Sequence, residues 1–165
     1  MSIFYRYEAS PIGPLLLGGV GEELHFLRFA GEEPEPDWIE DGGVLREVGA
    51  QLREYFAGER RDFDVALKPA GTEFQMAVWK ALLEIPYGET TTYGGIAERI
   101  GRPKAVRAVG AANGRNPIAI LQPCHRVIGS DGSLTGFGGG LPTKEKLLRL
   151  ERALPSQASL GITGG

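Results

Sequence analysis

The first third of the chain carries short runs of β-prone residues separated by turn residues. Three strands are predicted here, over Ile3–Ala9, Pro14–Val20 and Leu24–Ala30. Apolar residues then recur at helical spacing from Leu45 to Phe56, which predicts a helix of about four turns closed by Gly58. Apolar and polar residues alternate again over Asp62–Lys68, so a fourth strand is expected there.

The segment Gly31–Gly43 is acidic and proline-rich, and it is interpreted as a loop. Residues 1–67 are therefore expected to form a small α/β lobe of antiparallel strands plus one helix. No residue of this lobe has an evident chemical role, and His25 lies within a predicted strand between Leu24 and Phe26. We interpret the lobe as a scaffold.

The pattern becomes helical after a linker at Lys68–Gly71. Thr72 and Gln75 have the spacing of a capping box, and an apolar stripe follows them. A second helix is predicted over Thr90–Ile100, and a third is expected to open at Pro103 and run to Ala112. Two short helices joined by a glycine turn are typical of a helix-turn-helix, although an ordinary helical corner has the same pattern.

The third helix has the composition of a surface that approaches another molecule. Lys104 and Arg107 are three residues apart and are expected to share a helical face. The alanines between and after them, including Ala105, are small enough to allow a close approach. This content favours the helix-turn-helix.

The remainder of the chain is expected to combine turns, a buried run and a last helix. Residues 113–117 form a turn cluster, Ile118–Leu121 is an apolar run, and a helix capped by Thr143 extends to Leu154. The predicted second domain covers residues 72–155, and residues 156–165 are expected to be a flexible tail. The predicted fold class is α+β, with the α/β lobe followed by a mostly helical domain.

Composition narrows the class of protein. The chain has 165 residues, of which 42% are hydrophobic and 24% are charged, as in an ordinary globular protein. It contains neither an apolar segment long enough to span a membrane nor a signal peptide, and we expect a cytoplasmic protein. One cysteine and two histidines exclude an intramolecular disulfide and a Cys-rich zinc site, so no metal is expected.

The charges are distributed unevenly along the chain. The net charge of −3 argues against a nucleic-acid partner. However, the segment Glu22–Asp41 holds eight acidic residues and one arginine, whereas Arg99–Arg126 holds six Lys and Arg and no acidic residue. This asymmetry indicates that the second half meets a polyanion, unless the charges simply lie on solvated faces.

Cys124, the only thiol, has neighbours that point to a reactive residue. A single cysteine is most often a small buried hydrophobe. Here Pro123 precedes the cysteine, and His125 and Arg126 follow it, which are the positive surroundings that lower a thiol pKa. Adjacent side chains of an extended segment point to opposite faces, so His125 would need a bend in the chain or a bridging water to reach the sulfur.

A histidine base usually needs a partner that fixes its tautomer. The candidates are carboxylates of the last helix, chiefly Glu145 and Glu151, and the residues themselves do not decide between them. The glycine-rich run Leu134–Gly140 is either a linker or a bare-backbone surface for a flat ligand, on which Phe137 could stack.

Taken together, these motifs resemble the O6-alkylguanine-DNA alkyltransferases. The resemblance rests on PCHRV at residues 123–127, IPYGETTTYGGIA at 85–97, KAVRAVG at 104–110 and GFGGG at 136–140. It covers Gly71–Leu154, and the first lobe is similar only in its layout of strands followed by a helix. The resemblance implies a DNA repair protein that alkylates itself once, after the target nucleotide is flipped out of the duplex.

The resemblance also implies roles for the residues of the catalytic centre. Cys124 corresponds to the alkyl acceptor, and His125 corresponds to a general base that acts through a water. Glu151 corresponds to the carboxylate that orients the histidine. Tyr93 corresponds to a tyrosine whose hydroxyl assists the departing guanine.

Further roles follow for the DNA surface and the substrate pocket. Arg107 corresponds to an arginine that enters the duplex, and Asn116 corresponds to a hinge between the DNA-binding helices and the active-site segment. The expected DNA-binding residues are Arg107, Lys104, Ala105 and Arg126. The expected pocket and hinge residues are Asn116, Phe137, Gly138 and Lys144.

The sequence departs from the family pattern at a few positions. Phe137 and Gly138 stand where some relatives carry Tyr and Ser, and Arg102 precedes the recognition helix where a better N-cap is expected. The zinc ligands that some relatives carry in the first lobe are absent. The expected partner is double-stranded DNA containing O6-alkylguanine, and the protein is expected to be a monomer that uses no cofactor.

Two other classes of protein compete with this interpretation. A cysteine hydrolase could use Cys124, His125 and Glu151 for acyl transfer, but it would have no need of a helix-turn-helix. A binder without catalytic activity could be a transcription regulator or a lesion sensor. The presence of Cys124 argues against the lesion sensor, and the lack of an obvious dimerisation segment disfavours the regulator.

Overall fold

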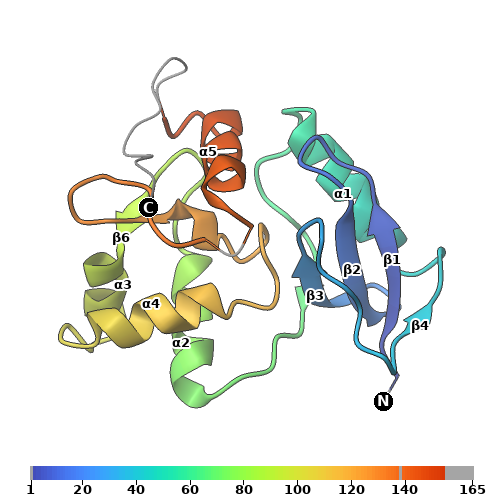
Figure 1. Cartoon of the computed structure of the whole chain (residues 1–165), viewed down its shortest axis with the longest axis horizontal. Helices are drawn as coiled ribbons and strands as arrows, with labels where there is room; N and C mark the ends of the chain where they lie inside the picture. The colour runs from blue at the N-terminus through green and yellow to red at the C-terminus, as the bar shows by residue number, and fades with distance from the viewer. Residues whose placement is uncertain (1, 138, 155–165) are drawn as a thin grey trace. The chain divides into compact units, whose positions relative to one another are not determined.

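The computed structural model describes residues 2–137 and 139–154, and Figure 1 shows the course of the chain. The chain divides into two compact units. One unit contains the residues up to Ala70 together with Pro117–Ala119, and the other contains Gly71–Asn116 together with the residues from Ile120 onward. Gly138 and the expected tail at 156–165 lie outside the described residues.

The first unit is built on a five-stranded sheet in the order β4-β1-β2-β3-β5. β1 (Phe4–Glu8), β2 (Leu15–Val20) and β3 (Glu23–Arg28) form an antiparallel meander, as the sequence predicts. The edges are two-residue strands that pair in parallel, β4 (Ile39–Glu40) with β1 and β5 (Ala66–Leu67) with β3. Two residues carry no alternation of apolar and polar positions, so the segment that contains β4 was expected to be a loop. The alternation over Asp62–Lys68 predicted a longer strand, but only Ala66 and Leu67 pair with β3.

α1 (Arg46–Phe56) completes the core of this unit. It is three turns long and follows Leu45, which takes a left-handed backbone with φ of 56°. The Glu22 carboxylate accepts hydrogen bonds from the backbone N–H groups of Arg46 and Glu47, both at 3.0 Å, and so caps the start of the helix. Apolar residues of this helix and of the central strands are fully buried and form the core: Leu15, Leu17, Leu27, Val48, Leu52 and Tyr55.

A segment from the second half of the chain extends the sheet of the first unit. Leu27 on β3 donates its N–H to the Pro117 carbonyl at 2.9 Å, and Ala119 donates back to the Leu27 carbonyl at 3.3 Å. Leu27 and Ile118 form a parallel bridge, and both are buried. The expected burial of Ile118–Leu121 is confirmed, but the sequence did not indicate that Ile118 and Ala119 belong to the first unit.

The second unit is mostly helical. Its helices are α2 (Glu73–Leu82), α3 (Tyr93–Arg99), α4 (Val106–Gly114) and α5 (Leu141–Leu150), with a short 3₁₀ helix η1 (Cys124–Arg126). Two short strands, β6 (Thr91–Thr92) and β7 (Val127–Ile128), pair in parallel. Apolar residues from these elements are fully buried and form the core: Val78, Leu82, Ile96, Val109 and Val127. The predicted capping box of Thr72 and Gln75 is present at the start of α2.

Three predicted helix starts are wrong. α3 begins at Tyr93 and not at Thr90, because the residues before it form β6 and Thr92 caps the helix through the N–H of Gly95. α4 begins at Val106, because Pro103 and Lys104 belong to a turn closed by the hydrogen bond from Ala105 N–H to the Arg102 carbonyl at 2.9 Å. Lys104 and Arg107 therefore do not share a helical face.

The third wrong start concerns the last helix. α5 begins at Leu141 after Gly140, whose φ is 91°, so Thr143 lies inside the first turn and does not cap it. The helix ends at Leu150, one residue before Glu151. Within residues 2–137 and 139–154, none of the helices has both the length and the apolar content needed to cross a bilayer.

Candidate active site

Cys124 opens the 3₁₀ turn η1 in the second unit and is 6% exposed. Pro123 precedes it, and the Cys124 N–H donates to the Gln122 carbonyl at 2.7 Å. Arg126 N–H closes the turn on the Pro123 carbonyl at 3.0 Å. The chain therefore bends at the cysteine and is not extended. His125 needs such a bend, or a bridging water, to act on the sulfur.

A buried cluster of three charged or titratable side chains stands beside the thiol. His125 and Glu151 are fully buried, and His125 Nε2 lies 2.7 Å from Glu151 Oε2. Glu151 is the C-cap residue of α5, so the end of that helix delivers the carboxylate to η1. Glu145 instead pairs with Arg149 on α5 at 3.1 Å, and the structure thus brings Glu151, not Glu145, to the histidine.

The tautomer of His125 follows from this contact. An ionised carboxylate can only accept hydrogen bonds, so Nε2 carries the proton and donates it to Glu151. Nδ1 then holds the free lone pair. It is buried and has no hydrogen-bonding partner among the described residues.

Arg126 completes the cluster, and this corrects its expected role at the DNA surface. Its Nε and Nη2 donate to the two oxygens of Glu151 at 2.8 and 3.1 Å, and Nη1 donates to the Ile85 carbonyl at 2.7 Å. The side chain is 9% exposed. A guanidinium with these donors committed inside the protein is not available to phosphates, so Arg126 is a buried partner of Glu151.

The electrostatics of the cluster define its resting state. Burial opposes ionisation of Glu151, but hydrogen bonds and charges from His125 and Arg126 outweigh it and lower the Glu151 pKa to about 2. Burial lowers the pKa of His125, and the Glu151 carboxylate only partly opposes this. At neutral pH the carboxylate is therefore charged and the imidazole is neutral.

Burial raises the pKa of the Cys124 thiol, although a hydrogen bond from the Asn116 side chain and the charge of Lys144 act in the opposite direction. The expectation that positive neighbours lower this pKa is therefore wrong for the resting protein. Desolvation dominates, and Arg126 is committed to Glu151. The resting cysteine is a thiol, so its proton must leave as the sulfur reacts.

Two side-chain amides, the buried Asn113 and the partly buried Asn116, connect the end of α4 to the cysteine segment. Asn113 Nδ2 lies 3.4 Å from the Cys124 carbonyl, and Asn116 Nδ2 donates to the Gln122 carbonyl at 2.7 Å. Gln122 Nε2 in turn donates to Asn116 Oδ1 at 2.7 Å. Sequence reasoning singled out Asn116 but missed Asn113 and Gln122, because a polar residue in a turn cluster or beside a proline carries no pattern that predicts its burial.

Lys144 is a fully buried ammonium group on α5. Its Nζ donates to the carbonyls of Val127 and Thr135 at 2.6 and 2.9 Å, and it lies 5.8 Å from the centre of the Phe137 ring. Burial lowers the Lys144 pKa to about 8, while the neighbouring Cys124 partly opposes the shift. Lys144 therefore ties the glycine-rich segment to β7 and brings a positive charge to the thiol.

Tyr93 approaches the same glycine-rich segment from the start of α3. Its hydroxyl lies 3.4 Å from the Thr135 carbonyl and 3.3 Å from the Thr135 hydroxyl. Tyr93 and Phe137 both pack against the core cluster that contains Cys124. Polar and aromatic groups thus converge near the sulfur.

No set of three or more His, Cys, Asp or Glu that could hold a metal occurs among the residues the structure describes.

α4 presents a polar and small-residue face to solvent. Val109 and Ala112 are buried, and the Trp79 indole N–H donates to the Ala112 carbonyl at 2.8 Å. Arg107, Ala108 and Ala111 are exposed on the other side. Ala105 precedes the helix as its N-cap residue and is partly buried.

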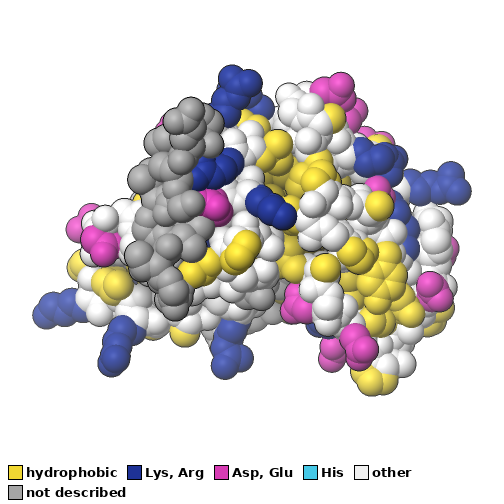
Figure 2. All heavy atoms as spheres, turned by 45° about the horizontal axis from the view of Figure 1, so that its top comes forward, with side chains coloured by type: hydrophobic (Ala, Val, Ile, Leu, Met, Phe, Trp, Pro, Cys, Tyr) yellow, Lys and Arg dark blue, Asp and Glu magenta, His cyan; other side chains and the backbone are white. Residues whose placement is uncertain are grey.

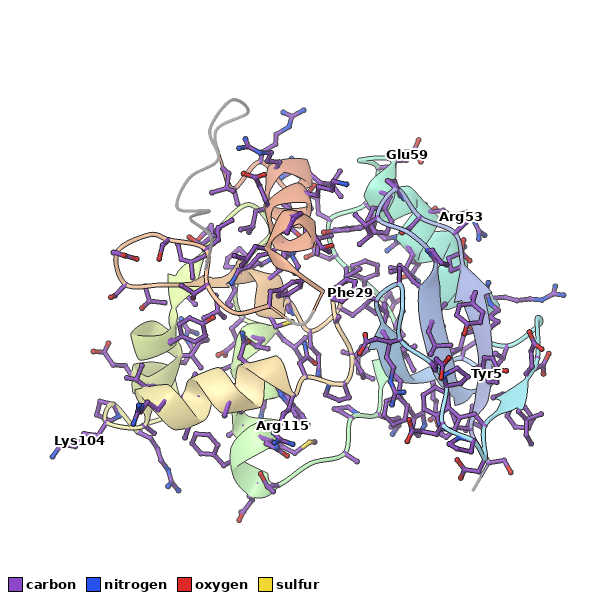
Figure 3. All side chains as sticks on the ribbon, in the orientation of Figure 1. Tyr5, Phe29, Arg53, Glu59, Lys104 and Arg115 are labelled. Atoms are coloured by element: carbon purple, nitrogen blue, oxygen red, sulfur yellow. The ribbon has the colours of Figure 1, made fainter. Side chains whose placement is uncertain are left out.

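The turn before α4 adds positive charge to this face. Figure 3 shows Lys104 projecting outward from the turn and Arg115 near the opposite end of α4. Gly101–Ala105 line an open hollow at the turn. Figure 2 shows several Lys and Arg side chains standing out separately from the surface. The exposed cations near α4 are Arg102, Lys104, Arg107 and Arg115.

A helix-turn-helix beside a buried Cys–His–Glu centre defines a class of DNA-modifying protein, and comparison with known families identifies it. Residues 3–69 match the model of the 6-O-methylguanine DNA methyltransferase ribonuclease-like domain, and residues 73–153 match that of the DNA-binding domain of the same protein. The chain belongs to the 6-O-methylguanine DNA methyltransferase family. The match to residues 3–69 extends the resemblance to the first lobe, which the sequence motifs did not cover.

Individual relatives agree with the family models. A methylated-DNA–protein-cysteine methyltransferase of Methanosarcina acetivorans is 57% identical over 153 residues, which cover 90% of this chain and 98% of the relative. The crystal structure of Mycobacterium tuberculosis O6-methylguanine methyltransferase is 54% identical with a TM-score of 0.86, covering 94% of this chain and 96% of that one. The structure of the M. tuberculosis protein in complex with DNA is 55% identical with a TM-score of 0.88, covering 91% and 93%.

Proposed function

We propose that this protein repairs DNA by moving the alkyl group from O6 of guanine to Sγ of its own Cys124, once per molecule. The observation that carries the proposal is the contact of 2.7 Å between His125 Nε2 and Glu151 Oε2, directly beside the only cysteine of the chain. The relatives named above are methyltransferases that act on methylated DNA and a protein cysteine. The partner is double-stranded DNA containing O6-alkylguanine, and the protein acts as a monomer.

Proton transfer from the thiol to His125 begins the reaction. The free lone pair of Nδ1 accepts the Cys124 proton through a bridging water, and the Glu151 carboxylate stabilises the imidazolium that forms. The positive charge of Lys144 and the hydrogen bond from Asn116 stabilise the thiolate as it develops. Arg126 keeps Glu151 ionised while the cluster is out of contact with bulk water.

The thiolate then displaces guanine from the alkyl carbon. A bond forms between Sγ and the alkyl carbon, and the bond from that carbon to O6 breaks. Negative charge builds on the departing guanine, and we infer that the Tyr93 hydroxyl, which contacts Thr135 in the resting protein, turns to donate a hydrogen bond to it. The proton that the thiol lost ends on the guanine, so the products are a neutral base and a thioether.

The lesion must leave the helix to reach a sulfur that is buried. Extruding a nucleotide costs a few kcal/mol in lost stacking and pairing. Arg107 is exposed on α4, and its side chain can fill the space that the nucleotide leaves. The small alanines beside it allow the helix to lie close to the DNA.

Titration with excess alkylated duplex tests the proposed function. A thioether offers water no carbonyl to attack, and no second cysteine exists to accept the alkyl group. We expect product formation to stop at one lesion per chain, with the added mass on the peptide that contains Cys124. A steady rate well beyond one equivalent, with the thiol recovered, would instead establish the cysteine hydrolase.

Arg107→Ala is expected to slow repair of a lesion in duplex DNA by about tenfold or more, since one lost contribution of about 1.4 kcal/mol has that effect. Reaction with a free O6-alkylguanine base should stay within about twofold, because no stack has to be opened. The rates are compared by intact-mass measurement. Arg115→Ala is the matched control, since it removes an exposed arginine from the end of the same helix. Equal losses on both substrates would place Arg107 in the pocket or in folding.

The reaction rate is expected to fall in acid as His125 becomes protonated and can no longer accept the thiol proton. Because burial lowers the His125 pKa, the rate should hold through neutral pH and fall only below the usual range of a histidine. The Glu151 charge raises the His125 pKa, so Glu151→Gln should move the falling limb to still lower pH while slowing the reaction. Glu145→Gln, which removes a carboxylate from the same helix, should leave the limb in place. Single-turnover rates with the free base measure both profiles, and a limb that moves toward higher pH in Glu151→Gln would contradict the assignment.

A further inference from the structure

The turn that follows α2 lies against the buried charge cluster of the active site. This turn spans residues 86–89, and the carbonyl of Ile85, directly before it, accepts a hydrogen bond from Arg126 Nη1 at 2.7 Å. Gly88 has a φ of 86°, and a Cβ atom at this position would lie only 3.3 Å from the Glu151 carbonyl oxygen. The backbone of the turn therefore approaches both Arg126 and Glu151, and glycine suits the closest point of that approach.

Tyr87, within this turn, contacts the same two residues through its side chain. Its hydroxyl donates to the Leu150 carbonyl at 3.2 Å, and that carbonyl belongs to the peptide group that leads into Glu151. The Arg126 guanidinium lies over the Tyr87 ring, 5.8 Å from its centre, which is within the range of a cation–π contact. One side chain thus contacts both the backbone that carries the carboxylate and the guanidinium that binds it.

The place of Glu151 in the fold makes such a contact important. Glu151 is the C-cap residue of α5, and the last carbonyls of a helix have no partner within that helix. Helix ends also fray, whereas the contact of 2.7 Å between His125 Nε2 and Glu151 Oε2 requires the carboxylate to stay in one place. Arg126 holds the two carboxylate oxygens, and the Tyr87 hydroxyl holds the backbone from which the carboxylate extends.

We propose that Tyr87 is a positioning residue for the reaction, which keeps Glu151 within hydrogen-bonding distance of His125 by holding the end of α5 and the Arg126 guanidinium. The inference rests on the proposed function, in which His125 accepts the proton of Cys124. When the hydroxyl is lost, the peptide group between Leu150 and Glu151 loses a donor and the end of the helix can move. The carboxylate then stabilises the imidazolium less well as it forms.

Two substitutions at Tyr87 test the two contacts. Tyr87→Phe keeps the ring over Arg126 and removes only the hydroxyl, so it should react about threefold to tenfold more slowly with a free O6-alkylguanine base. Tyr87→Leu removes the ring as well and should react more slowly still, by about tenfold or more. The free base is used because it needs no contact with the DNA surface. Equal rates in the two variants would contradict the part assigned to the ring.

The dependence of the rate on pH separates positioning from a general loss of stability. The charged groups that act on His125 are Glu151 at the end of α5, Lys144 within α5 and Arg126 on η1, and of these only Glu151 raises the His125 pKa. A less firmly held carboxylate raises that pKa less. The limb that falls in acid should therefore move to lower pH in Tyr87→Phe, in the same direction as in Glu151→Gln but by a smaller amount.

Tyr55→Phe is the matched control. Tyr55 lies on α1 in the first unit and is fully buried, so the substitution removes the same hydroxyl from a site remote in sequence from the cluster. It is expected to leave the reaction rate and the acid limb unchanged, whatever its effect on thermal stability. The effect of losing a tyrosine hydroxyl on folding is thereby separated from an effect on Glu151.

A double-mutant cycle with Glu151→Gln decides whether Tyr87 acts through Glu151. In the Glu151→Gln background, Tyr87→Phe should change the rate by less than about twofold, because the carboxylate that it positions is gone. The inference is overturned if Tyr87→Phe reacts at the wild-type rate, if its acid limb stays in place or moves to higher pH, or if its full loss persists in that background.

The wild-type protein in the same assay tests the proposed function separately. Absence of an alkyl adduct on Cys124 would refute that function and, with it, the role of Tyr87. An adduct that forms in the wild type and at the same rate in both Tyr87 variants would refute the role of Tyr87 alone.

Discussion

Cys124→Ala is expected to abolish alkyl transfer and to leave the affinity for DNA within about twofold of the wild type. The sulfur is the only thiol of the chain, and a thiolate is a far stronger nucleophile toward an alkyl carbon than the imidazole and the carboxylate beside it. Binding should persist because we expect the exposed cations around α4 to contact the phosphates, while Cys124 is buried. Intact-mass measurement after incubation with an O6-methylguanine duplex gives the first result, and fluorescence anisotropy gives the second.

Cys124→Ser provides the control for a change of packing, since it keeps a side chain of similar shape. It should fail to transfer as Cys124→Ala does, because a hydroxyl is a far weaker nucleophile than a thiolate. Clearance of the lesion by either variant would remove Cys124 from the mechanism. A parallel loss of DNA binding in both would mean that the cysteine segment helps to shape the DNA-binding surface.

Glu151→Leu is expected to lower the free energy of unfolding by about 3–5 kcal/mol and to slow transfer by about 100-fold or more. Glu151 receives two hydrogen bonds from Arg126 in a buried site, so its removal leaves a guanidinium charge without its partner. His125 loses the carboxylate that fixes its tautomer and stabilises its protonated form. Urea unfolding gives the stability, and single-turnover kinetics gives the rate.

The double variant Arg126→Met, Glu151→Leu separates these two effects. Replacing both members of a buried ion pair by apolar residues often recovers the stability that breaking the pair removes. We therefore expect most of the lost stability to return while transfer stays slow, because His125 still lacks Glu151. A double variant that recovers its rate together with its stability would show that Glu151 contributes to folding alone.

Local signals in the sequence predict the elements whose residues carry their own pattern. The strands of the meander, the helix beginning near Leu45 and the capping box at Thr72 all follow from spacing and cap chemistry, and each is present. Pro103 shows where such signals mislead. A proline is favoured at the first position of a helix, but here it fits equally well in the turn that precedes α4.

The contacts that form the active-site cluster cannot be predicted from any local sequence pattern. Composition pointed to Cys124 and His125, whereas the choice of Glu151 over Glu145 came from the resemblance and is matched by the observed contact. Arg126 was expected on the DNA surface because it ends the segment Arg99–Arg126, which holds six Lys and Arg and no acidic residue. Its pairing with Glu151 depends on where the end of α5 lies, and that is set by the packing of the whole unit.

The bridge between Leu27 and Ile118 constrains how this protein can be divided or inherited. We expect that dividing the chain near Ala70 would not give two pieces that fold independently, because the first would lack Pro117–Ala119 and the second would carry an unpaired apolar segment. That segment lies between α4 and the cysteine in the sequence. A recombination that exchanged the first unit would therefore also have to change Pro117–Ala119, which are close in sequence to the nucleophile. The first unit and the segment Pro117–Ala119 are therefore expected to change together over evolution.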